Sequence, residues 1–179
     1  VQNFAPNNVI RTARQLNCLS ELSQDYFYYF TNRYVQERDI DFREYSIYQN
    51  GNQLHSLTPM FSTNEHFRGE YDGQNHIITG FTMAFQNRSS VGLFASVIGG
   101  TIKNVVMVGN PPSSPVAEVR GGQKVGALVG VSNAGKLINC TVSGFQVKGT
   151  SDVGGLVGYA YSNTEIANCS VGIYPDAPG

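Results

Sequence analysis

An internal repeat in the second half of the chain constrains the fold more than any other feature of the sequence. Three segments align with one another, and they cover residues 91–109, 125–144 and 153–172. Each segment opens with a Val-Gly pair and later carries an asparagine between apolar residues. Such self-similarity at a spacing of about 30 residues is typical of solenoids, in which one unit buries its apolar face only by stacking on the next.

The pattern inside each segment predicts strands. Apolar and polar residues alternate around the repeated asparagine, as in Ile-x-x-Val-x-Met and Leu-x-x-Cys-x-Val, and Val, Ile and Thr dominate. A leucine-rich repeat has a similar period, but its L-x-x-L-x-L pattern and its helical segment are missing here. An antiparallel sandwich does not require matching columns of residues. The sequence therefore predicts an all-β fold, a short parallel β-helix whose coils pair through parallel strands.

The repeat continues toward the N-terminus in weaker form. Residues 76–83 (HIITGFTM) align with the end of a coil, so that Ile78 shares a column with Ile102 and Gly80 takes the asparagine position. Residues 38–42 (RDIDF) fit a first, shorter rung because their apolar and acidic residues alternate.

A change in composition separates the N-terminal region from the repeats. All 20 glycines lie from Gly51 onward, so the two regions follow different backbone rules. The three prolines of NPPSSP suit a protruding loop inside the repeats. We expect three parts in order: residues 1–34 as a capping helix with an aromatic segment, 35–172 as about four or five β-helix coils with a loop inserted at 110–116, and 173–179 as a linker.

Residues 12–22 (TARQLNCLSEL) are predicted to form a helix. Thr12 is a suitable N-cap, and Gln15 stands at the capping-box position. Apolar residues follow at helical spacing, at Ala13, Leu16, Leu19 and Leu22. Because the open end of a β-helix exposes backbone edges that natural proteins cover, we expect this helix to cap the first coil.

An aromatic-rich segment, YFYYFTNRY at residues 26–34, follows the predicted helix. Packing into a small core beneath the helix is one interpretation of this segment. The other is an exposed aromatic platform that stacks on sugars.

Composition narrows the range of partners. Lys and Arg total 12 and Asp and Glu total 13, a formal net charge of −1, which argues against a protein that binds nucleic acid by neutralising phosphates. No apolar run reaches the roughly 18 residues of a membrane span.

The three cysteines show neither a CxxC pair nor metal-ligand spacing. The chain opens on Val-Gln-Asn without a leader, so we expect it to be part of a larger parent chain.

Two sets of residues recur at equivalent repeat positions and are expected to form structural ladders along the stack. The predicted ladder residues are Asn104, Asn139 and Asn168 at a turn, and Cys140 and Cys169 facing inward. Each amide can donate to the coil above and satisfy turn backbone groups. Adjacent coils lie about 4.8 Å apart, within the Cα range of a disulfide, but we favour a reduced cysteine pair because parallel neighbours rarely orient two thiols correctly.

Four carboxylates are the best candidates in the sequence for a chemically active or ligand-binding site. They are Asp39, Asp41, Glu70 and Asp72. Asp39 and Asp41 alternate with apolar residues and so share one face of a rung. Carbohydrate-active β-helix enzymes cluster carboxylates on one outward face for acid–base work or Ca²⁺ binding, whereas a solvated strand face and an Asp-Gly turn explain the same residues without any site. We therefore treat them as a candidate binding cluster, assign no catalytic residue, and expect no cofactor or metal apart from Ca²⁺ at this cluster.

The repeats resemble the GLUG-motif family of bacterial secreted and surface proteins. GGLVG at 154–158 fits the Gly-Leu-x-Gly signature of that family, GALVG at 126–130 fits closely, and GLFAS at 92–96 fits loosely. FRGEYDGQNHIITGFTM at 67–83 is similar to the entry segment of such repeats, and the resemblance covers roughly 35–172. It implies right-handed parallel β-helices, an extracellular or cell-surface location in bacteria, and no shared catalytic residues.

These observations favour a non-catalytic module of a bacterial cell-surface or secreted protein. We expect it to act as a scaffold or adhesin that presents a rigid face to a glycan or a host protein, and the loop at 110–124 is the best candidate contact by exposure and length. A carbohydrate-active β-helix enzyme is an alternative that requires the four carboxylates to converge in one groove. A purely structural stalk is another, and it requires that no groove or aromatic platform be exposed.

Overall fold

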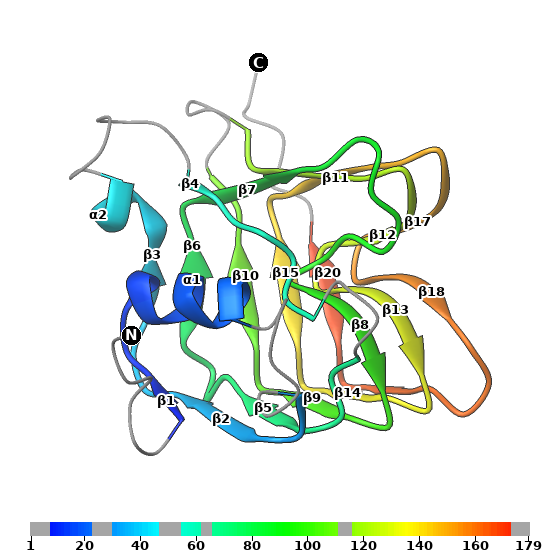
Figure 1. The fold of residues 1–179 in the computed structure, drawn as a ribbon, viewed down its shortest axis with the longest axis horizontal. Helices are drawn as coiled ribbons and strands as arrows, with labels where there is room; N and C mark the ends of the chain where they lie inside the picture. The colour runs from blue at the N-terminus through cyan, green and yellow to red at the C-terminus, as the bar shows by residue number, and fades with distance from the viewer. Residues whose placement is uncertain (1–7, 23–29, 47–54, 62–65, 111–115, 173–179) are drawn as a thin grey trace.

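The computed structural model describes residues 8–22, 30–46, 55–61, 66–110 and 116–172 (Figure 1). Within these ranges the chain consists mostly of short strands, which pair in parallel throughout, and two helices lie near the N-terminus. The predicted all-β class is therefore confirmed, together with the parallel pairing.

The largest sheet collects one strand from each successive pass of the chain. Its strands are, in spatial order, β1 (Val9–Ile10), β2 (Arg33–Gln36), β5 (Glu70–Asp72), β9 (Thr101–Lys103), β14 (Lys136–Ile138) and β19 (Glu165–Ala167). Spatial order follows chain order, so each pass adds its strand beside the previous one. We call each such pass a coil.

The other sheets are built in the same way. The second contains β3 (Ile40–Asp41), β6 (Ile77–Thr79), β10 (Val106–Val108), β15 (Thr141–Ser143) and β20 (Ser170–Gly172). The third contains β4 (His55–Ser56), β7 (Phe81–Ala84), β11 (Glu118–Arg120) and β16 (Gln146–Lys148). The last two contain β8 (Phe94–Ile98), β13 (Val129–Asn133) and β18 (Val157–Ala160), and β12 (Gln123–Gly126) and β17 (Ser151–Gly154). In Figure 1 the coils follow one another from β3 and β6 on the left to β18 and β20 on the right.

Strand pairing confirms the columns predicted for the three best repeats. Ile102, Leu137 and Ile166 lie opposite one another on β9, β14 and β19. Met107, Val142 and Val171 do the same on β10, β15 and β20. Inward-facing residues of one kind therefore stack along the coils and form a continuous apolar core.

The alignment predicted for residues 76–83 was wrong. Ile78 pairs with Met107, and the residue opposite Ile102 is Tyr71. The period-two alternation looks the same in both alignments, so it does not choose between them. A hydrogen bond at the turn fixes the alignment. The backbone N–H of Asn75 donates to the carbonyl of Asn104, so Asn75, not Gly80, occupies the asparagine position.

The predicted helix is present as α1 (Ala13–Leu22). Its first turn is capped as expected, since the Gln15 N–H donates to the Thr12 hydroxyl at 3.2 Å and the Gln15 carboxamide accepts from the Arg11 N–H at 2.7 Å. The buried side of α1 faces the first coil, where Asn17 Oδ1 lies 2.9 Å from His55 Nε2. The helix follows β1 directly and therefore covers the N-terminal end of the core. A short second helix, α2 (Phe42–Ser46), starts immediately after β3.

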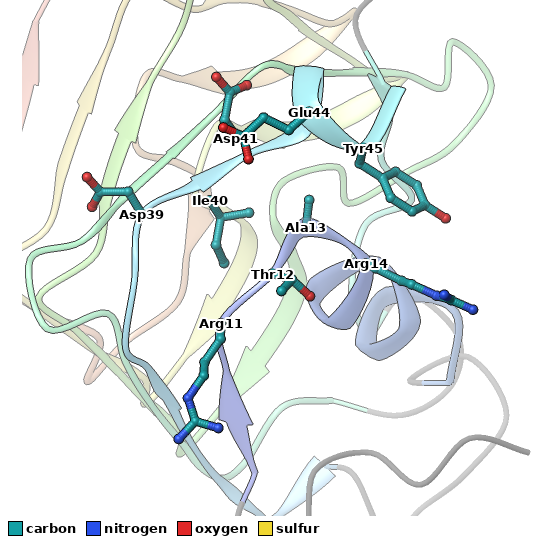
Figure 2. Close-up of a pocket in the computed structure, with 9 residues that line it drawn as sticks. All are labelled: Arg11, Thr12, Ala13, Arg14, Asp39, Ile40, Asp41, Glu44 and Tyr45. Carbon is teal, nitrogen blue, oxygen red and sulfur yellow. The ribbon is translucent and has the colours of Figure 1, made fainter. Parts of the chain in front are cut away.

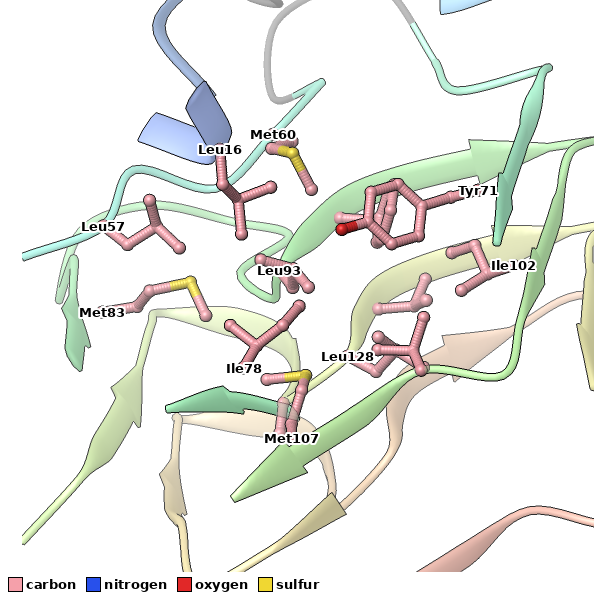
Figure 3. Packing of buried hydrophobic residues seen from close by; sticks show 14 of the residues in the cluster. Leu16, Leu57, Met60, Tyr71, Ile78, Met83, Leu93, Ile102, Met107 and Leu128 are labelled. Atoms are coloured by element: carbon pink, nitrogen blue, oxygen red, sulfur yellow. The ribbon is translucent and has the colours of Figure 1, made fainter. Parts of the chain in front are cut away.

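The core runs without a break from α1 into the coils. Figure 3 shows Leu16 of α1 beside Met60 and above Leu57, with Ile78, Met107 and Leu128 of later coils below them. Aromatic rings fill the region nearest the helix, and the two described aromatic residues of the 26–34 segment, Phe30 and Tyr34, are buried there. Core packing is therefore confirmed for these two residues, and 26–29 lie outside the described part of the chain.

The opposite end of the stack is open to solvent. Leu137 and Val142 are 0% and 2% exposed, whereas Ile166 and Val171, one coil further along the same columns, are 48% and 54% exposed. The difference arises because the described chain places no further coil beyond β19 and β20.

Candidate functional site

Two of the four predicted carboxylates line a cleft at the N-terminal end of the molecule. The cleft has a volume of about 250 Å³ and lies between the start of α1 and the β3–α2 segment (Figure 2). Asp39, Asp41 and Glu44 line it together with Arg11 and Arg14. We call it the N-terminal cleft, and it contains both positive and negative side chains.

Both aspartates of this cleft are already engaged by basic partners or backbone amides. Asp41 accepts hydrogen bonds from the Arg43 guanidinium at 2.6–3.0 Å and from the Arg43 N–H. Burial alone would raise the pKa of Asp41, but these bonds and the Arg43 charge outweigh it and lower that pKa. Asp39 accepts from the Ile77 N–H at 2.8 Å and lies 3.2 Å from His76 Nδ1.

The other two carboxylates lie on β5 and share a different partner. Lys103 Nζ is 2.9 Å from Glu70 and 3.6 Å from Asp72, and its hydrogen bond to Glu70 raises the pKa of the lysine. Arg33 also pairs with Glu70, at 3.0 Å. Asp72 accepts from Asn104 Nδ2, and although burial opposes it, this bond and the neighbouring lysine lower the pKa of Asp72.

The four carboxylates thus form two separate pairs. Glu70 and Asp72 are not among the residues that line the N-terminal cleft. Within the described residues no group of three or more His, Cys, Asp or Glu side chains is placed to hold a metal ion. Ca²⁺ at these carboxylates therefore has no geometric support in that part of the chain.

A second cleft, of about 350 Å³, lies on the outward side of the β8–β13–β18 sheet. We call it the tyrosine cleft. Its lining combines one aromatic ring with several hydrogen-bonding groups, contributed by His66, Ser89, Ser90, Ser96, Lys124, Asn133 and Tyr161. These residues come from four successive coils, so the stacking of the coils creates the cleft.

Exposed aromatic rings stand at one side of the tyrosine cleft. Tyr159 and Tyr161 are 38% and 44% exposed, and their rings meet edge to face at 4.7 Å between centroids. Lys124 Nζ lies 5.4 Å from the centre of the Tyr159 ring, within cation–π range. Strand pairing places Ser96, Val131 and Tyr159 in one row across β8, β13 and β18.

A polar pair stands at the other side of this cleft. His66 Nδ1 and Ser96 Oγ are 2.8 Å apart, which holds the imidazole ring in place. Among the described residues no hydrogen bond or ion pair joins His66 to a carboxylate, so the orienting acid of a Ser-His-Asp triad is missing there. The arrangement of a ring beside fixed hydrogen-bonding groups in a concave surface is typical of binding sites for polar small molecules and sugars.

Sequence reasoning did not identify the tyrosine cleft. The sequence feature that could have indicated it is YAYS at 159–162. Its two tyrosines, two residues apart, occupy the positions of Val131 and Asn133 in the preceding coil. His66 and Ser96 gave no signal, since only the winding of the chain brings them together.

The asparagines and cysteines lie at equivalent positions along the stack. Asn104, Asn139 and Asn168 all adopt the left-handed conformation, with φ between 53° and 55°. Asn139 Nδ2 donates to Asn104 Oδ1 at 2.8 Å, so that the amide bonds to a side chain of the preceding coil, where we had expected a backbone carbonyl. Cys140 and Cys169 are both free thiols, and burial raises the pKa of Cys140 to about 12.

The loop expected at 110–116 is described only at its two ends. Asn110 is buried and Val116 is exposed, and 111–115 lie outside the described residues. The predicted linker at 173–179 lies outside them as well.

Comparison with known families assigns the repeat. The family model described as the GLUG motif matches residues 149–172, which contain β17 to β20. Residues 149–172 therefore carry a GLUG motif. The matched segment is the last described coil, the one that carries Tyr159 and Tyr161.

The chain is also similar to Halomucin from Haloquadratum walsbyi. The two are 30% identical over 129 residues, which is 72% of this chain and 1% of Halomucin. This relative is archaeal, so a bacterial origin of the chain stays a prediction. No solved structure matches the chain. Neither described helix has the length and apolar character needed to cross a bilayer.

Proposed function

We propose that this chain is a non-catalytic module of a cell-surface or secreted protein, in which a right-handed parallel β-helix presents the tyrosine cleft to glycans. The similarity to Halomucin and the GLUG motif support the surface or secreted location. Parallel pairing of every coil with the next supports the β-helix.

The observation that carries the proposal is the pair of exposed tyrosines beside a polar cleft. A pyranose ring has an apolar face of C–H groups, which packs on an aromatic ring, and a rim of hydroxyls, which requires fixed donors and acceptors. Tyr161 supplies the ring, and Ser89, Ser90 and Asn133 supply hydrogen-bonding groups within the same cleft. Few rotamers need to be fixed on binding, because the groups stand on strands or next to them and His66 is already bonded to Ser96.

The alternatives have less support from the geometry. A purely structural stalk was expected to expose no groove and no aromatic platform, whereas both are present among the described residues. A carbohydrate-active enzyme was expected to gather Asp39, Asp41, Glu70 and Asp72 in one groove, whereas they form two pairs with separate basic partners.

A glycan array tests the proposal. The labelled wild-type chain is compared with Tyr161→Ala, which removes the stacking surface, and with Tyr161→Phe, which keeps the ring and removes only the hydroxyl. We expect saturable binding to a defined set of sugars, a loss of about tenfold or more in affinity for Tyr161→Ala, and a smaller loss for Tyr161→Phe. A blank array from folded protein, or equal affinity of the alanine variant, contradicts glycan binding at this cleft.

A further inference from the structure

The open end of the stack presents a contiguous apolar surface. We call it the terminal face and define it by the inward residues of the last coil, Val153, Leu156, Val157, Ile166 and Val171. Val153, Ile166 and Val171 are among the most exposed large apolar side chains of the described chain, and their partners one coil earlier, Val125, Leu137 and Val142, are buried.

Backbone edges surround these side chains. β16, β17, β18, β19 and β20 each stand at the end of their sheet, and all five ends lie at the same end of the stack. Each edge strand carries backbone N–H and C=O groups that point away from the preceding coil and are free to pair with another strand. The terminal face therefore combines an apolar centre with five surrounding strand edges. The unpaired backbone groups of all five edges point to the place that a following coil would occupy.

The last coil does not have the character of a cap. Terminal units of solenoids are normally atypical, with a polar outer side that protects the end of the core. Here the opposite holds, because residues 149–172 are the segment that matches the GLUG motif itself. The other end of the molecule shows what a covered end looks like, since Leu16 and Leu19 of α1 are fully buried against the first coil.

We propose that the terminal face binds a polypeptide coil of the same GLUG type, which adds one parallel strand to each of the five sheets. The surface is continuous with the established coil-to-coil interface and repeats it one step further. Ile166 continues the column of Leu137, and Val171 continues the column of Val142. An added coil with the same alternation of apolar and polar residues therefore buries both exposed side chains.

A second copy of the chain fits this face less well. Its N-terminal end is covered by α1, so head-to-tail stacking of two copies requires the helix to leave the core. Two copies that meet through their terminal faces are related by a two-fold axis, which reverses strand direction. The five edges then face antiparallel partners and cannot all pair at once.

Binding of a synthetic coil in trans tests the proposal. The probe is a fluorescein-labelled peptide with the sequence of residues 144–172, titrated with the full chain and followed by fluorescence anisotropy. The control peptide has the same composition in scrambled order. We expect saturable binding of the first peptide and none of the second, together with slower amide hydrogen exchange in β16 to β20 of the full chain.

Variants of the full chain locate the binding. Ile166→Asp and Val171→Asp place a carboxylate where the added coil becomes buried, and we expect each to weaken binding about tenfold or more. Because both side chains are half exposed in the free chain, we expect both variants to fold, which circular dichroism checks. Val116→Asp is the matched control, since Val116 is equally exposed and lies outside the terminal face, and its affinity should equal that of the wild type.

Three results overturn the proposal. The first is no binding of the repeat peptide to the folded chain at millimolar concentration. The second is equal weakening by Val116→Asp and Ile166→Asp. The third is a dimer in analytical ultracentrifugation that Val171→Asp abolishes while the repeat peptide does not bind, which identifies a second copy as the occupant.

Discussion

Truncation of two residues in one column, one coil apart, should have very different effects on stability. Leu137 and Ile166 lie directly opposite each other on β14 and β19, and their side chains are 0% and 48% exposed. Leu137→Ala leaves a cavity between two coils, and such substitutions cost about 2–5 kcal/mol. Ile166→Ala removes a side chain whose full burial is worth about 1.5–3 kcal/mol but which is only half buried, and the space it leaves opens to solvent. We expect a loss of about 3 kcal/mol for Leu137→Ala and about 1 kcal/mol for Ile166→Ala.

Urea unfolding of the two variants measures this difference. The chain contains no tryptophan and 10 tyrosines, so far-UV circular dichroism and tyrosine fluorescence are the suitable signals. Midpoints are compared with that of the wild type, and the slopes are checked for a change in the surface that unfolding exposes. Equal losses for the two variants contradict the reasoning, because they require that Ile166 be as well covered as Leu137.

Two further predictions concern single residues. Burial lowers the pKa of His55, and the charge of Glu21 only partly offsets this. The unfolded chain then binds the proton more tightly, so the stability that neutral His55 contributes is complete above pH about 6.5 and is lost as the pH falls through the lower folded value. The urea midpoint should therefore fall between pH 7.5 and pH 5, and a His55→Gln variant should lose part of that slope; an unchanged slope contradicts the prediction. Asn139 holds φ at 55° and bonds to Asn104, so Asn139→Ala should cost about 1–3 kcal/mol in the same assay. Asn139→Gly, which accepts that backbone conformation, should cost less, and the reverse order of the two variants rules out the backbone explanation.

The sequence contained enough information to predict the stacked parallel strands. The columns at Ile102, Leu137 and Ile166 recur because identical neighbours bury one another, and the structure places them in register. Helix α1 was also predictable, since the N-cap at Thr12 and the apolar spacing both act within a few residues. Local signals of this kind do not depend on how distant parts of the chain meet.

The parts that were not predicted depend on long-range closure. The register of 76–83 was misaligned because the alternation of Ile78 with its neighbours fits two alignments, and the bond between Asn75 and the next coil decides between them. The strand pattern placed Asp39 and Asp41 on one side of a rung, but Arg43, the partner of Asp41, belongs to a helix that the pattern did not indicate.

The tyrosine cleft was missed for a related reason. Outward-facing residues of a coil are not constrained by the core, so their positions show no period that an alignment can detect. His66, Ser96 and Tyr161 come from different coils and meet only after the chain has wound around.

A protein-observed NMR titration with the strongest glycan from the array tests the central claim most directly. The account predicts that the backbone amides of Tyr161, Lys124 and Ser96, which line the tyrosine cleft, and of Tyr159, which adjoins it, shift together with one dissociation constant. Shifts confined to the N-terminal cleft around Arg11 and Asp39, or to the 110–124 loop, would contradict it, as would a spectrum that does not change at any glycan concentration.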